Sequence, residues 1–407
     1  MHFSFSALDE CNFFRYNEAM ELLIPVAAGL EQTVKRQLNK LGYERCPAEN
    51  GRICVEGDWN DVARLNVFLR SGERVLVKLA HFKATTFDEL YGGMYAVSWE
   101  NYLKTDSLIL MDGKCFQSTL GAIKACGGVA KKAIIRRLAD KKNNARTTFT
   151  ETGARTVVGF SIYRDEVTVT IDTTGDGLHK RGYRTLTVAA PLKETLAACL
   201  IDNTFYNPDA DEEKPFADPF CGSGTLPIEA ALKALNIAPG LHRSFDFENW
   251  AFIPSSYSTH AREEAKDNEK RERKVQIFGS DISPEAISIA RYHAKQAGVE
   301  RYIRFSVLDA RKFTSKTPYG VLLSNPPYGE RLLDTTAVQT LMREFGKTFR
   351  ALPDWNAYLF TSLVGFERYF GKNADKKKKL SNANLPCELY SYFGKPPKSQ
   401  DKQDKIK

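Results

Sequence analysis

Short apolar strands alternate with helical segments between residues 215 and 362. We expect strands at 215–219, 275–281, 304–307, 319–324 and 356–362, and helices at 225–235, 284–297 and 341–352. This alternation is typical of a doubly wound parallel sheet, because parallel strands need long crossover connections that are usually helical. A last antiparallel pair, around Lys379 and 388–393, would close one edge. The predicted fold class is α/β, with a mostly parallel sheet that ends in an antiparallel hairpin.

Polar residues stand at the ends of four successive strands: Asp218, Asp281, Asp309 and Asn325. Open α/β sheets bind ligands at the carboxyl ends of their strands, where these four side chains would meet. A helix N-cap explains a single aspartate at such a position equally well. The recurrence at all four strand ends favours a ligand site.

The first of these strands runs into a glycine-rich turn, Asp218-Pro219-Phe220-Cys221-Gly222-Ser223-Gly224-Thr225. Gly222 and Gly224 let the backbone approach a ligand closely, and Thr225 can cap the next helix. Pro227 breaks the Gly-x-Gly-x-x-Gly dinucleotide fingerprint, and the Gly-Lys-Ser/Thr of a phosphate-binding P-loop is missing from the turn. The acidic entrance, Asp218, suits a ligand with an ammonium group, such as S-adenosylmethionine.

The fourth strand ends in Ser324-Asn325-Pro326-Pro327-Tyr328. Two successive prolines remove two backbone donors and fix two φ angles. This turn is stiff and lacks these two donors, and it lies beside an amide and an aromatic ring. Such a turn is suited to bind a flat ring that carries an amine. The motif therefore points to a flipped nucleobase, and a rigid loop after a buried strand is the alternative interpretation.

The composition is that of a basic globular protein. At 407 residues, with 43% hydrophobic and 27% charged residues, the chain is long enough for two or three domains. Its net charge is +8, and basic pairs cluster at 131–132, 136–137 and 141–142, with a lysine block at 376–379. Such clusters fit phosphate binding by a nucleic-acid partner, and they also occur on solvated faces.

The eight cysteines are scattered, without a Cys-x-x-Cys pair, which argues against a structural zinc site or an iron–sulfur cluster. No metal is therefore expected. Dispersed thiols suit a reducing cytoplasm. No apolar run approaches the roughly 18 residues of a membrane span, and residues 1–16 lack the pattern of a signal peptide. We expect a cytoplasmic protein.

The N-terminal half divides into small units. Residues 1–20 are expected to be an extension. Strand, helix, strand, strand, helix and strand at 22–26, 30–41, 44–49, 52–56, 59–69 and 74–82 indicate a ferredoxin-like domain at 21–75. A second α/β unit at 76–175 has helices at 86–97 and 118–138, the latter interrupted at Gly127-Gly128, and a hairpin at 156–163 and 167–171. A linker (176–190), a catalytic domain (191–394) with an insertion at 236–274, and a disordered tail (395–407) complete the prediction.

These motifs together resemble the class I amino-methyltransferases, which use S-adenosylmethionine. The resemblance rests on Pro191-Leu192-Lys193, the glycine turn, Asp281, Asp309 and Asn325-Pro326-Pro327-Tyr328. The fuller match is similar to the THUMP-containing branch that acts on RNA, with the guanine-N2 methyltransferases of large-subunit ribosomal RNA nearest. Residues 177–184 resemble that family's junction between its THUMP and catalytic domains. The resemblance covers residues 21–394 and implies a Rossmann-like catalytic domain behind ferredoxin-like and THUMP units.

The resemblance implies a role for each matching residue. Asp218 to Thr225 would hold the methionine portion of the cofactor, Asp281 the ribose hydroxyls and Asp309 the adenine amine. The full set expected at the cofactor is Pro191, Leu192, Asp218, Phe220, Gly222, Gly224, Thr225, Asp281, Ile282, Asp309 and Ala310. The catalytic set is Asn325, Pro326, Pro327 and Tyr328. The residues expected to bind RNA are Lys131, Lys132, Arg136, Arg137, Lys180 and Arg181.

In the catalytic set, the side-chain oxygen of Asn325 and the carbonyl of Pro326 would accept hydrogen bonds from the target amine, and Tyr328 would stack on the base. Related chemistry on a transfer RNA guanine or on an adenine of DNA or RNA is the first alternative, since the Asn-Pro-Pro-Tyr signature serves adenine and guanine amines alike. A non-catalytic RNA-binding assembly factor is an alternative of another class. An oxidoreductase is disfavoured by the missing dinucleotide fingerprint.

Overall fold

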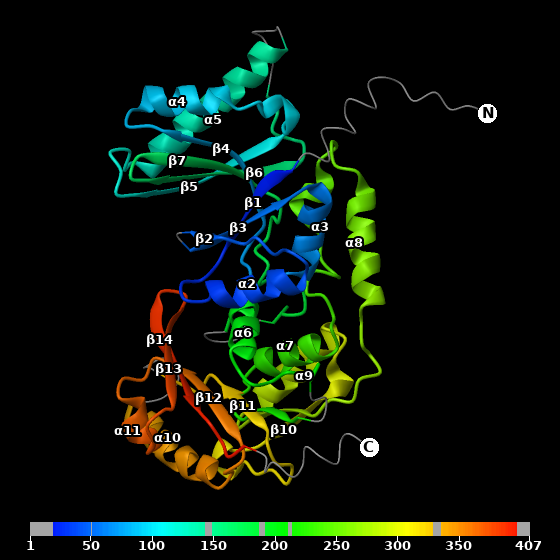
Figure 1. Cartoon of the computed structure of the whole chain (residues 1–407), viewed down its shortest axis with the longest axis vertical. Coiled ribbons are helices and arrows are strands. Elements are labelled where there is room, and N and C mark those ends of the chain that lie inside the picture. Colours follow the sequence, from blue (N-terminus) through cyan, green and yellow to red (C-terminus); the bar gives the residue numbers. More distant parts are fainter. Residues whose placement is uncertain are drawn as a thin grey trace, which may run out of the picture. The chain divides into compact units, whose positions relative to one another are not determined.

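The computed structural model describes residues 19–49, 51–142, 149–186, 192–210, 214–328 and 335–396 (Figure 1). The chain divides into two compact units that exchange segments along the sequence. Unit 1 takes its described residues from Met1–Pro25, Leu38–Leu178 and Arg243–Glu264, and unit 2 takes them from Val26–Gln37, His179–His242 and Ala265–Lys407. Most of the predicted extension (1–20) and of the predicted tail (395–407) lies outside the described residues.

Unit 1 contains a seven-stranded sheet in the order β2-β3-β1-β4-β7-β6-β5. Its strands are β1 (Met20–Pro25), β2 (Ala48–Glu49), β3 (Arg52–Gly57), β4 (Leu76–Lys83), β5 (Leu108–Phe116), β6 (Arg155–Tyr163) and β7 (Glu166–Asp172). Its helical segments are α3 (Trp59–Phe68), α4 (Phe87–Ala96), α5 (Ile123–Lys141) and the 3₁₀ turns Trp99–Asn101 and Asp246–Asn249. Helix α2 (Glu31–Lys40) and helix α8 (Ser255–Asp267) each cross from one unit into the other.

The strand order β2-β3-β1-β4 is the one that a split βαβ arrangement produces, as the sequence predicts. β4 pairs with β1 on one side and with β7 on the other, so one sheet continues across the predicted boundary at residue 75. The strand predicted at 44–49 is reduced to the two residues of β2. The chain just before the predicted strand closes the end of α2 and does not join the sheet. There the backbone N–H of Tyr43 donates to Leu38 O at 3.0 Å.

Helices α4 and α5 cover one face of the strands β4 to β7 (Figure 1). Their buried side chains meet the inward residues of β5, β6 and β7, and the core includes Leu90, Met94, Ala130, Ile134, Ile109, Val158, Phe160 and Val169. The predicted break at Gly127-Gly128 is wrong, because α5 runs through both glycines without interruption. Gly127 is buried where a Cβ would lie 3.7 Å from Met111 and Phe160, so this position takes part in close helix–sheet packing.

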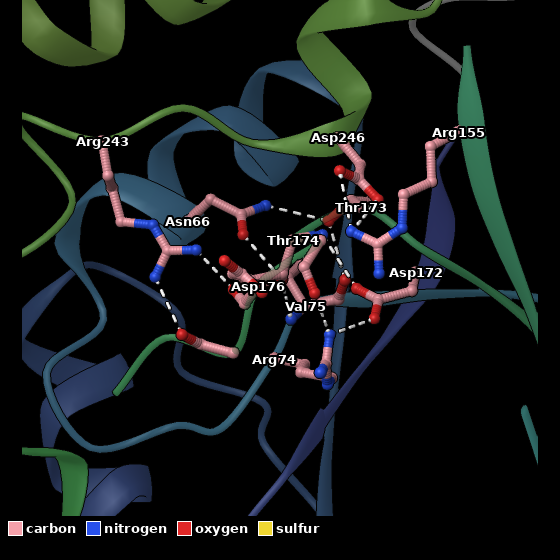
Figure 2. A network of polar contacts seen from close by, with 12 residues as sticks. Asn66, Arg74, Val75, Arg155, Asp172, Thr173, Thr174, Asp176, Arg243 and Asp246 are labelled. Carbon is pink, nitrogen blue, oxygen red and sulfur yellow. Dashed lines mark hydrogen bonds and ion pairs between the residues drawn. The ribbon is translucent and has the colours of Figure 1, made fainter. Parts of the chain in front are cut away.

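A buried polar network fixes the turn that follows β7 (Figure 2). Asn66 Nδ2 donates to Thr173 Oγ1 at 2.9 Å, and Thr174 Oγ1 donates to Asn66 Oδ1 at 2.8 Å. Thr173 Oγ1 also donates to Val75 O at 2.7 Å. The segment predicted as a boundary on its turn-forming residues is thus held at fixed positions, since buried polar groups with satisfied partners are costly to separate.

Part of the predicted insertion belongs to unit 1 rather than to the catalytic domain. Within 236–274, the stretch Arg243–Glu264 packs into unit 1. Arg243 donates to Gly177 O at 2.9 Å, and the indole N–H of Trp250 donates to Arg155 O at 3.1 Å. The ring of Trp250 also lies edge-on to Trp59 of α3, with 6.1 Å between centroids. The inserted chain is therefore a structural component of unit 1.

Unit 2 contains a second seven-stranded sheet, in the order β10-β9-β8-β11-β12-β14-β13. Its strands are β8 (Phe216–Asp218), β9 (Ile277–Asp281), β10 (Ile303–Val307), β11 (Val321–Ser324), β12 (Asn356–Thr361), β13 (Lys376–Asn382) and β14 (Leu385–Tyr392). Its helices are α6 (Glu194–Asp202), α7 (Thr225–Ala234), α9 (Pro284–Gln296), α10 (Thr335–Arg350) and α11 (Phe366–Phe370), with 3₁₀ turns at Glu300–Tyr302 and Ala310–Lys312.

The pairing in unit 2 confirms the predicted α/β fold class. The neighbours from β10 to β12 are parallel, whereas β14 is antiparallel to both β12 and β13. An aromatic core supports the hairpin side of this sheet and includes Phe345, Phe349, Trp355, Phe366, Phe370, Tyr390 and Tyr392. Within the described ranges, no helix is both long and apolar enough to cross a bilayer.

Candidate active site

The carboxyl ends of four parallel strands bring the predicted polar residues to one edge of the sheet in unit 2. β8 ends at Asp218, β9 at Asp281 and β11 at Ser324, directly before Asn325. β10 ends two residues before Asp309. Because these four strands are neighbours in the order β10-β9-β8-β11, their ends face a common space, as sequence reasoning expects.

The glycine turn between β8 and α7 is tied to the second strand. The backbone N–H of Gly222 donates to Asp281 Oδ2 at 3.0 Å, and that of Cys221 donates to Ser280 O at 2.9 Å. Gly222 has φ +50°, and a Cβ built on it would meet nothing within 4 Å. Gly224 has φ +86° and a Cβ there would lie only 3.0 Å from Ala290. Gly222 therefore leaves open space beside the turn, whereas Gly224 allows α9 to pack closely.

The expectation that Thr225 caps α7 is wrong. The N-cap is Gly224, which has no side-chain hydrogen bond, and Thr225 is the first helical residue. Its hydroxyl instead accepts a hydrogen bond from Arg184 at 3.1 Å. The same guanidinium donates to the carbonyl of Leu192 at 2.6 Å and lies 3.3 Å from Glu194. Arg184, which sequence reasoning missed as a site residue, thus connects Leu192 to the start of α7.

Asp218 is buried and has no cationic partner among the described residues. Its Oδ1 accepts from Ser324 Oγ at 2.5 Å and from the Phe220 backbone at 3.0 Å. Burial raises the pKa of this carboxyl to about 7; the two hydrogen bonds lower it, and the charge of Asp281 raises it further. A positively charged ligand beside Asp218 would compensate a carboxylate that is costly to ionise. Ser324 is a second residue that the sequence reading left out.

Asp281 has both oxygens engaged by backbone donors and still has capacity for a ligand. Oδ2 accepts from Gly222 as above, and Oδ1 accepts from the Ser283 backbone at 3.0 Å. Ser283, not Asp281, is the N-cap of α9, so the alternative interpretation of Asp281 as a cap is wrong. A carboxylate offers about four lone-pair positions. Two therefore remain for hydroxyl groups such as those of a ribose.

An apolar side chain lies exposed beside this carboxylate. Ile282 is 67% exposed, and Val307 at the end of β10 is 53% exposed. Large apolar side chains at a strand-end site offer contact area for a flat ring such as adenine. Phe220 is half-buried and turns its ring edge-on to Phe345, with 4.9 Å between centroids. Phe220 thus supports the glycine turn from the core side.

Asp309 and Ala310 are placed less favourably than the sequence suggests. Asp309 caps the 3₁₀ turn Ala310–Lys312, and both of its oxygens accept from the guanidinium of Arg311. This hydrogen bonding to Arg311 lowers the pKa of the Asp309 carboxyl. Ala310 is buried against the core of unit 2. An adenine amine that bound Asp309 would share its carboxylate oxygens with the Arg311 guanidinium. Ala310 would contact the cofactor through its backbone rather than through its side chain.

Asn325 carries the most informative atom of the site. Its side-chain oxygen is buried, and it accepts no hydrogen bond from any residue in the described part of the chain. An orphaned buried acceptor costs roughly 1–3 kcal/mol, so its retention calls for a partner. The turn that holds it, Pro326-Pro327, follows the fully buried end of β11. The geometry thus offers an acceptor to a donor that is not part of the described chain.

The ring of Tyr328 is anchored from the hairpin. Asn382, at the end of β13, donates from Nδ2 to Tyr328 Oη at 3.0 Å. Burial raises the pKa of the tyrosine hydroxyl, while hydrogen bonds from Asn382 and Asn325 lower it. Asn382 is a third residue that sequence reasoning missed, since nothing near it in the sequence indicates a site.

Of Pro191 and Leu192, which are both expected at the cofactor, only Leu192 is described. Leu192 is buried, and its carbonyl is held by Arg184 as given above. Pro191 lies outside the described residues. Among the described residues, no cluster of three or more His, Cys, Asp or Glu side chains is arranged to hold a metal ion.

The predicted RNA-binding residues differ in accessibility. Lys132 and Arg136 of α5 are exposed, and so is Lys180. Lys131 is half-buried and donates to Ile109 O at 3.0 Å, while Arg137 lies 2.8 Å from Glu100.

The assignment of Arg181 to RNA binding is wrong. Its side chain is buried and lies 3.5 Å from the equally buried Glu229. The hydroxyl of Tyr183 donates to the same carboxylate at 3.1 Å. The sequence around residue 181 is basic, but it does not form a basic surface at this position because the fold places the Arg181 guanidinium in the interior. Removing one partner of such a pair leaves an uncompensated buried charge.

Comparisons with known proteins identify related methyltransferases. A family model described as "RlmL ferredoxin-like domain" matches residues 21–76, and one described as "RMKL-like, methyltransferase domain" matches residues 181–391. "Putative RNA methyltransferase YpsC" of Bacillus subtilis (strain 168) is 39% identical over 374 residues, which cover 92% of this chain and 96% of YpsC. "Ribosomal RNA large subunit methyltransferase K/L" of Psychromonas ingrahamii is 34% identical over 92% of this chain. This chain spans 50% of that longer relative.

Solved structures share the fold, and one of them is a complex with SAH. SMU.472, "a putative methyltransferase complexed with SAH", is 39% identical with a TM-score of 0.88, covering 94% of this chain and 100% of the other. A "predicted N6-adenine-specific DNA methylase" from Listeria monocytogenes is 42% identical with a TM-score of 0.88, covering 95% and 98% of the two chains. SAH is the demethylated product of S-adenosylmethionine, and the buried Asp218, the open Gly222 and the exposed Ile282 fit that cofactor. The chain belongs to the RMKL-like methyltransferase family, and its cofactor is S-adenosylmethionine.

Proposed function

We propose that this chain methylates the exocyclic N2 amine of a guanine in large-subunit (23S) ribosomal RNA. The buried Asn325 oxygen without a described donor carries this proposal, because it offers an acceptor to a planar amine. The stiff turn around it cannot supply donors of its own at Pro326 and Pro327. A base that enters this site must leave its helix, as bases do in enzymes that modify them.

The chemistry of the site follows from the weak nucleophilicity of such an amine. Its lone pair is delocalised into the ring, so the protein must favour the geometry in which that pair points at the methyl donor. The Asn325 oxygen and the Pro326 carbonyl would accept the two N–H groups and stabilise the positive charge that develops on nitrogen. When bound, S-adenosylmethionine would supply the electrophilic methyl group, whose bonding pair stays on the departing sulfur, and the methylated nitrogen would release one proton to solvent. Tyr328, whose hydroxyl is held by Asn382, would stack on the base.

RNA as the substrate class rests on the N-terminal half and on the relatives. Residues 76–175 would serve as a THUMP-type RNA-binding unit, with Lys132 and Arg136 on the exposed side of α5. The names of YpsC and of methyltransferase K/L support RNA, and the second name supports large-subunit ribosomal RNA. A reducing cytoplasm belongs to the same proposal, because the seven described cysteines are all free thiols.

An experiment can decide whether the target base is guanine or adenine. The name of the Listeria structure favours an adenine amine, and the acceptors of the site suit either base. Nucleoside mass spectrometry of RNA from cells with and without this protein would show which methylated nucleoside is lost. Loss of N2-methylguanosine from large-subunit RNA supports the proposal, and loss of N6-methyladenosine replaces it with the adenine alternative. An unchanged RNA profile would refute both assignments for RNA, and the same analysis of DNA would then test the adenine alternative there.

The role of Asn325 is tested with purified protein and unmodified ribosomal RNA. We expect Asn325→Ala to lower methyl transfer by at least 100-fold, in line with the removal of one acceptor used mainly in the transition state. Its affinity for S-adenosylmethionine, measured by calorimetry, should stay within a few-fold of the wild type. Asn60→Ala, at an exposed position of α3, is the matched control and should retain full activity. Wild-type rates for the Asn325 variant would remove the acceptor role.

A further inference from the structure

At β5 and β6, the face of the unit 1 sheet that lies opposite α4 and α5 carries exposed or half-buried side chains. α4 and α5 pack on the inward residues of β5 and β6, such as Ile109 and Phe160. The alternate residues of these two strands point the other way. Leu110, Asp112, Lys114, Phe116 and Tyr163 are exposed there. We call the carboxyl end of this face, formed by Lys114, Phe116, Tyr163 and Arg164, the β5–β6 platform.

Two stacked aromatic rings form the centre of the platform. Phe116 and Tyr163 are direct neighbours in the parallel register of β5 and β6. Their rings lie 6.0 Å apart between centroids with only 7° between their planes. Phe116 is 64% exposed and Tyr163 is 37% exposed. β5 is the last strand in the sheet order, so the Phe116 ring stands at an edge of the sheet.

A cation extends this stack. The Arg164 guanidinium lies 5.2 Å from the centroid of the Tyr163 ring, and its Nε donates to Gln117 at 3.3 Å. The backbone N–H of Arg164 donates to Phe116 O at 3.3 Å, which links the ends of the two strands. Planar arginine and aromatic groups both stack on nucleobases. Phe116, Tyr163 and Arg164 therefore lie next to one another, and each is a planar group of a kind that stacks on bases.

The loops beneath the platform are held in place. Asp165 accepts from the hydroxyl of Ser118 at 2.8 Å and from the backbone of Thr119 at 2.9 Å. Arg164 and Asp165 both have positive φ values, +52° and +65°. A non-glycine pair in this conformation costs energy unless its surroundings fix it. The backbone at Arg164 and Asp165, next to Tyr163, is thus held in place without a partner.

We propose that the β5–β6 platform binds an unpaired nucleobase of RNA by stacking. Exposed aromatic side chains on an open sheet face serve this purpose in single-strand RNA binders, because a base that is free of its helix has a π-face available. Arg164 and Lys114 would neutralise neighbouring phosphates on a chain of net charge +8. This inference deepens the proposed function and rests on its assignment of RNA as substrate. It adds that the substrate presents a single-stranded segment to unit 1.

The test uses the full-length protein and two fluorescein-labelled probes, a 12-nucleotide single-stranded RNA and a blunt duplex of the same sequence. We expect Phe116→Ala and Tyr163→Ala each to weaken binding of the single strand on the order of 10-fold, with duplex binding unchanged. The salt dependence of binding should keep its slope, since neither change removes a charge. Arg164→Gln should weaken binding and also reduce the slope. Phe116→Trp should retain affinity, and its new indole should be quenched by the bound base.

Matched controls separate the platform from general effects on the protein. Phe87→Ala removes a 42% exposed aromatic ring that lies in the first turn of α4 rather than on β5 or β6, and this variant should bind both probes like the wild type. All variants should keep wild-type affinity for S-adenosylmethionine.

Single-strand binding at wild-type affinity by both alanine variants would overturn the proposal, as would an equal weakening for the duplex. A change of oligomeric state in sedimentation, with RNA binding intact, would instead show that the platform binds a second copy. If the wild-type protein binds the single strand through these rings but methylates no RNA, the proposed function fails and the platform stands. If the protein methylates RNA and the variants do so equally well, the platform alone fails.

Discussion

The buried carboxyl of Asp218 makes cofactor binding depend on pH in a calculable way. Its pKa lies at about 7 without a ligand, chiefly because of burial, and no cation of the described chain contributes to it. S-adenosylmethionine carries positive charge, which would favour the ionised carboxylate and lower this pKa. Binding then releases a proton, so affinity should rise with pH until Asp218 is ionised in the free protein. For a pKa of about 7, the expected increase between pH 6 and pH 8 is about 10-fold.

Calorimetry in buffers of different ionisation enthalpy measures both the affinity and the released proton. Asp218→Asn keeps an acceptor for Ser324 and Phe220 but cannot ionise, so its affinity should be lower at pH 8 and flat between pH 6 and pH 8. Wild-type affinity that is flat over this range, or a variant with the wild-type pH profile, would refute the reasoning.

The pH dependence of the free energy of unfolding gives an independent measure of the Asp218 pKa. The folded-state pKa of Asp218 is raised above its ordinary value of 3.8, so ionisation opposes folding increasingly as pH rises from about 4 to 7. The full difference corresponds to at most about 4 kcal/mol above pH 7. Without cofactor, Asp218→Asn should therefore unfold at higher denaturant concentration than the wild type at pH 8, and this advantage should vanish near pH 4. A variant that is less stable at pH 8 would contradict the assigned pKa.

Three further changes test other parts of the proposed function. Asp281→Ala should weaken S-adenosylmethionine binding at least 10-fold by calorimetry, since it removes ribose acceptors and releases the Gly222 backbone; unchanged affinity would remove the ribose role. Lys132→Gln with Arg136→Gln should reduce the salt slope of RNA binding by about 1 for each phosphate that the variant no longer neutralises, and an unchanged slope would assign both side chains to solvent. Asn382→Ala should free the Tyr328 hydroxyl, lowering kcat while cofactor affinity stays within two-fold; an unchanged kcat would make that hydrogen bond purely structural.

The strand ends of unit 2 were predictable because apolar strands that alternate with helices have few ways to pack. Asp281 and Asn325 could be assigned on that basis alone, since the carboxyl ends of neighbouring parallel strands meet at one edge. Their roles in ligand binding remain predictions. The unpartnered state of the Asn325 oxygen among the described residues could not be read from the sequence, because it depends on what surrounds the turn in space.

Residues whose behaviour depends on distant partners were the ones assigned wrongly or missed. Arg181 is surrounded by basic residues in the sequence, yet its side chain is buried, where it pairs with Glu229 on α7. Asn382 reaches Tyr328 only because β13 takes the outer position next to β14. Thr225 does not take its expected capping role because Gly224 adopts a left-handed conformation at the cap. Local patterns specify elements, whereas these interactions are set by tertiary pairing.

The exchange of segments between the two units limits how this protein can be cut. A fragment that ends at Leu178 would keep the sheet of unit 1 but lack Arg243–Glu264. It would then expose the face of Trp59 that Trp250 covers and leave Gly177 O without Arg243. A fragment that begins at His179 would carry the same inserted stretch with no core to bury it. Neither half is thus a self-contained piece of sequence, and gene fragments that respect the linear domain borders should yield aggregation-prone proteins.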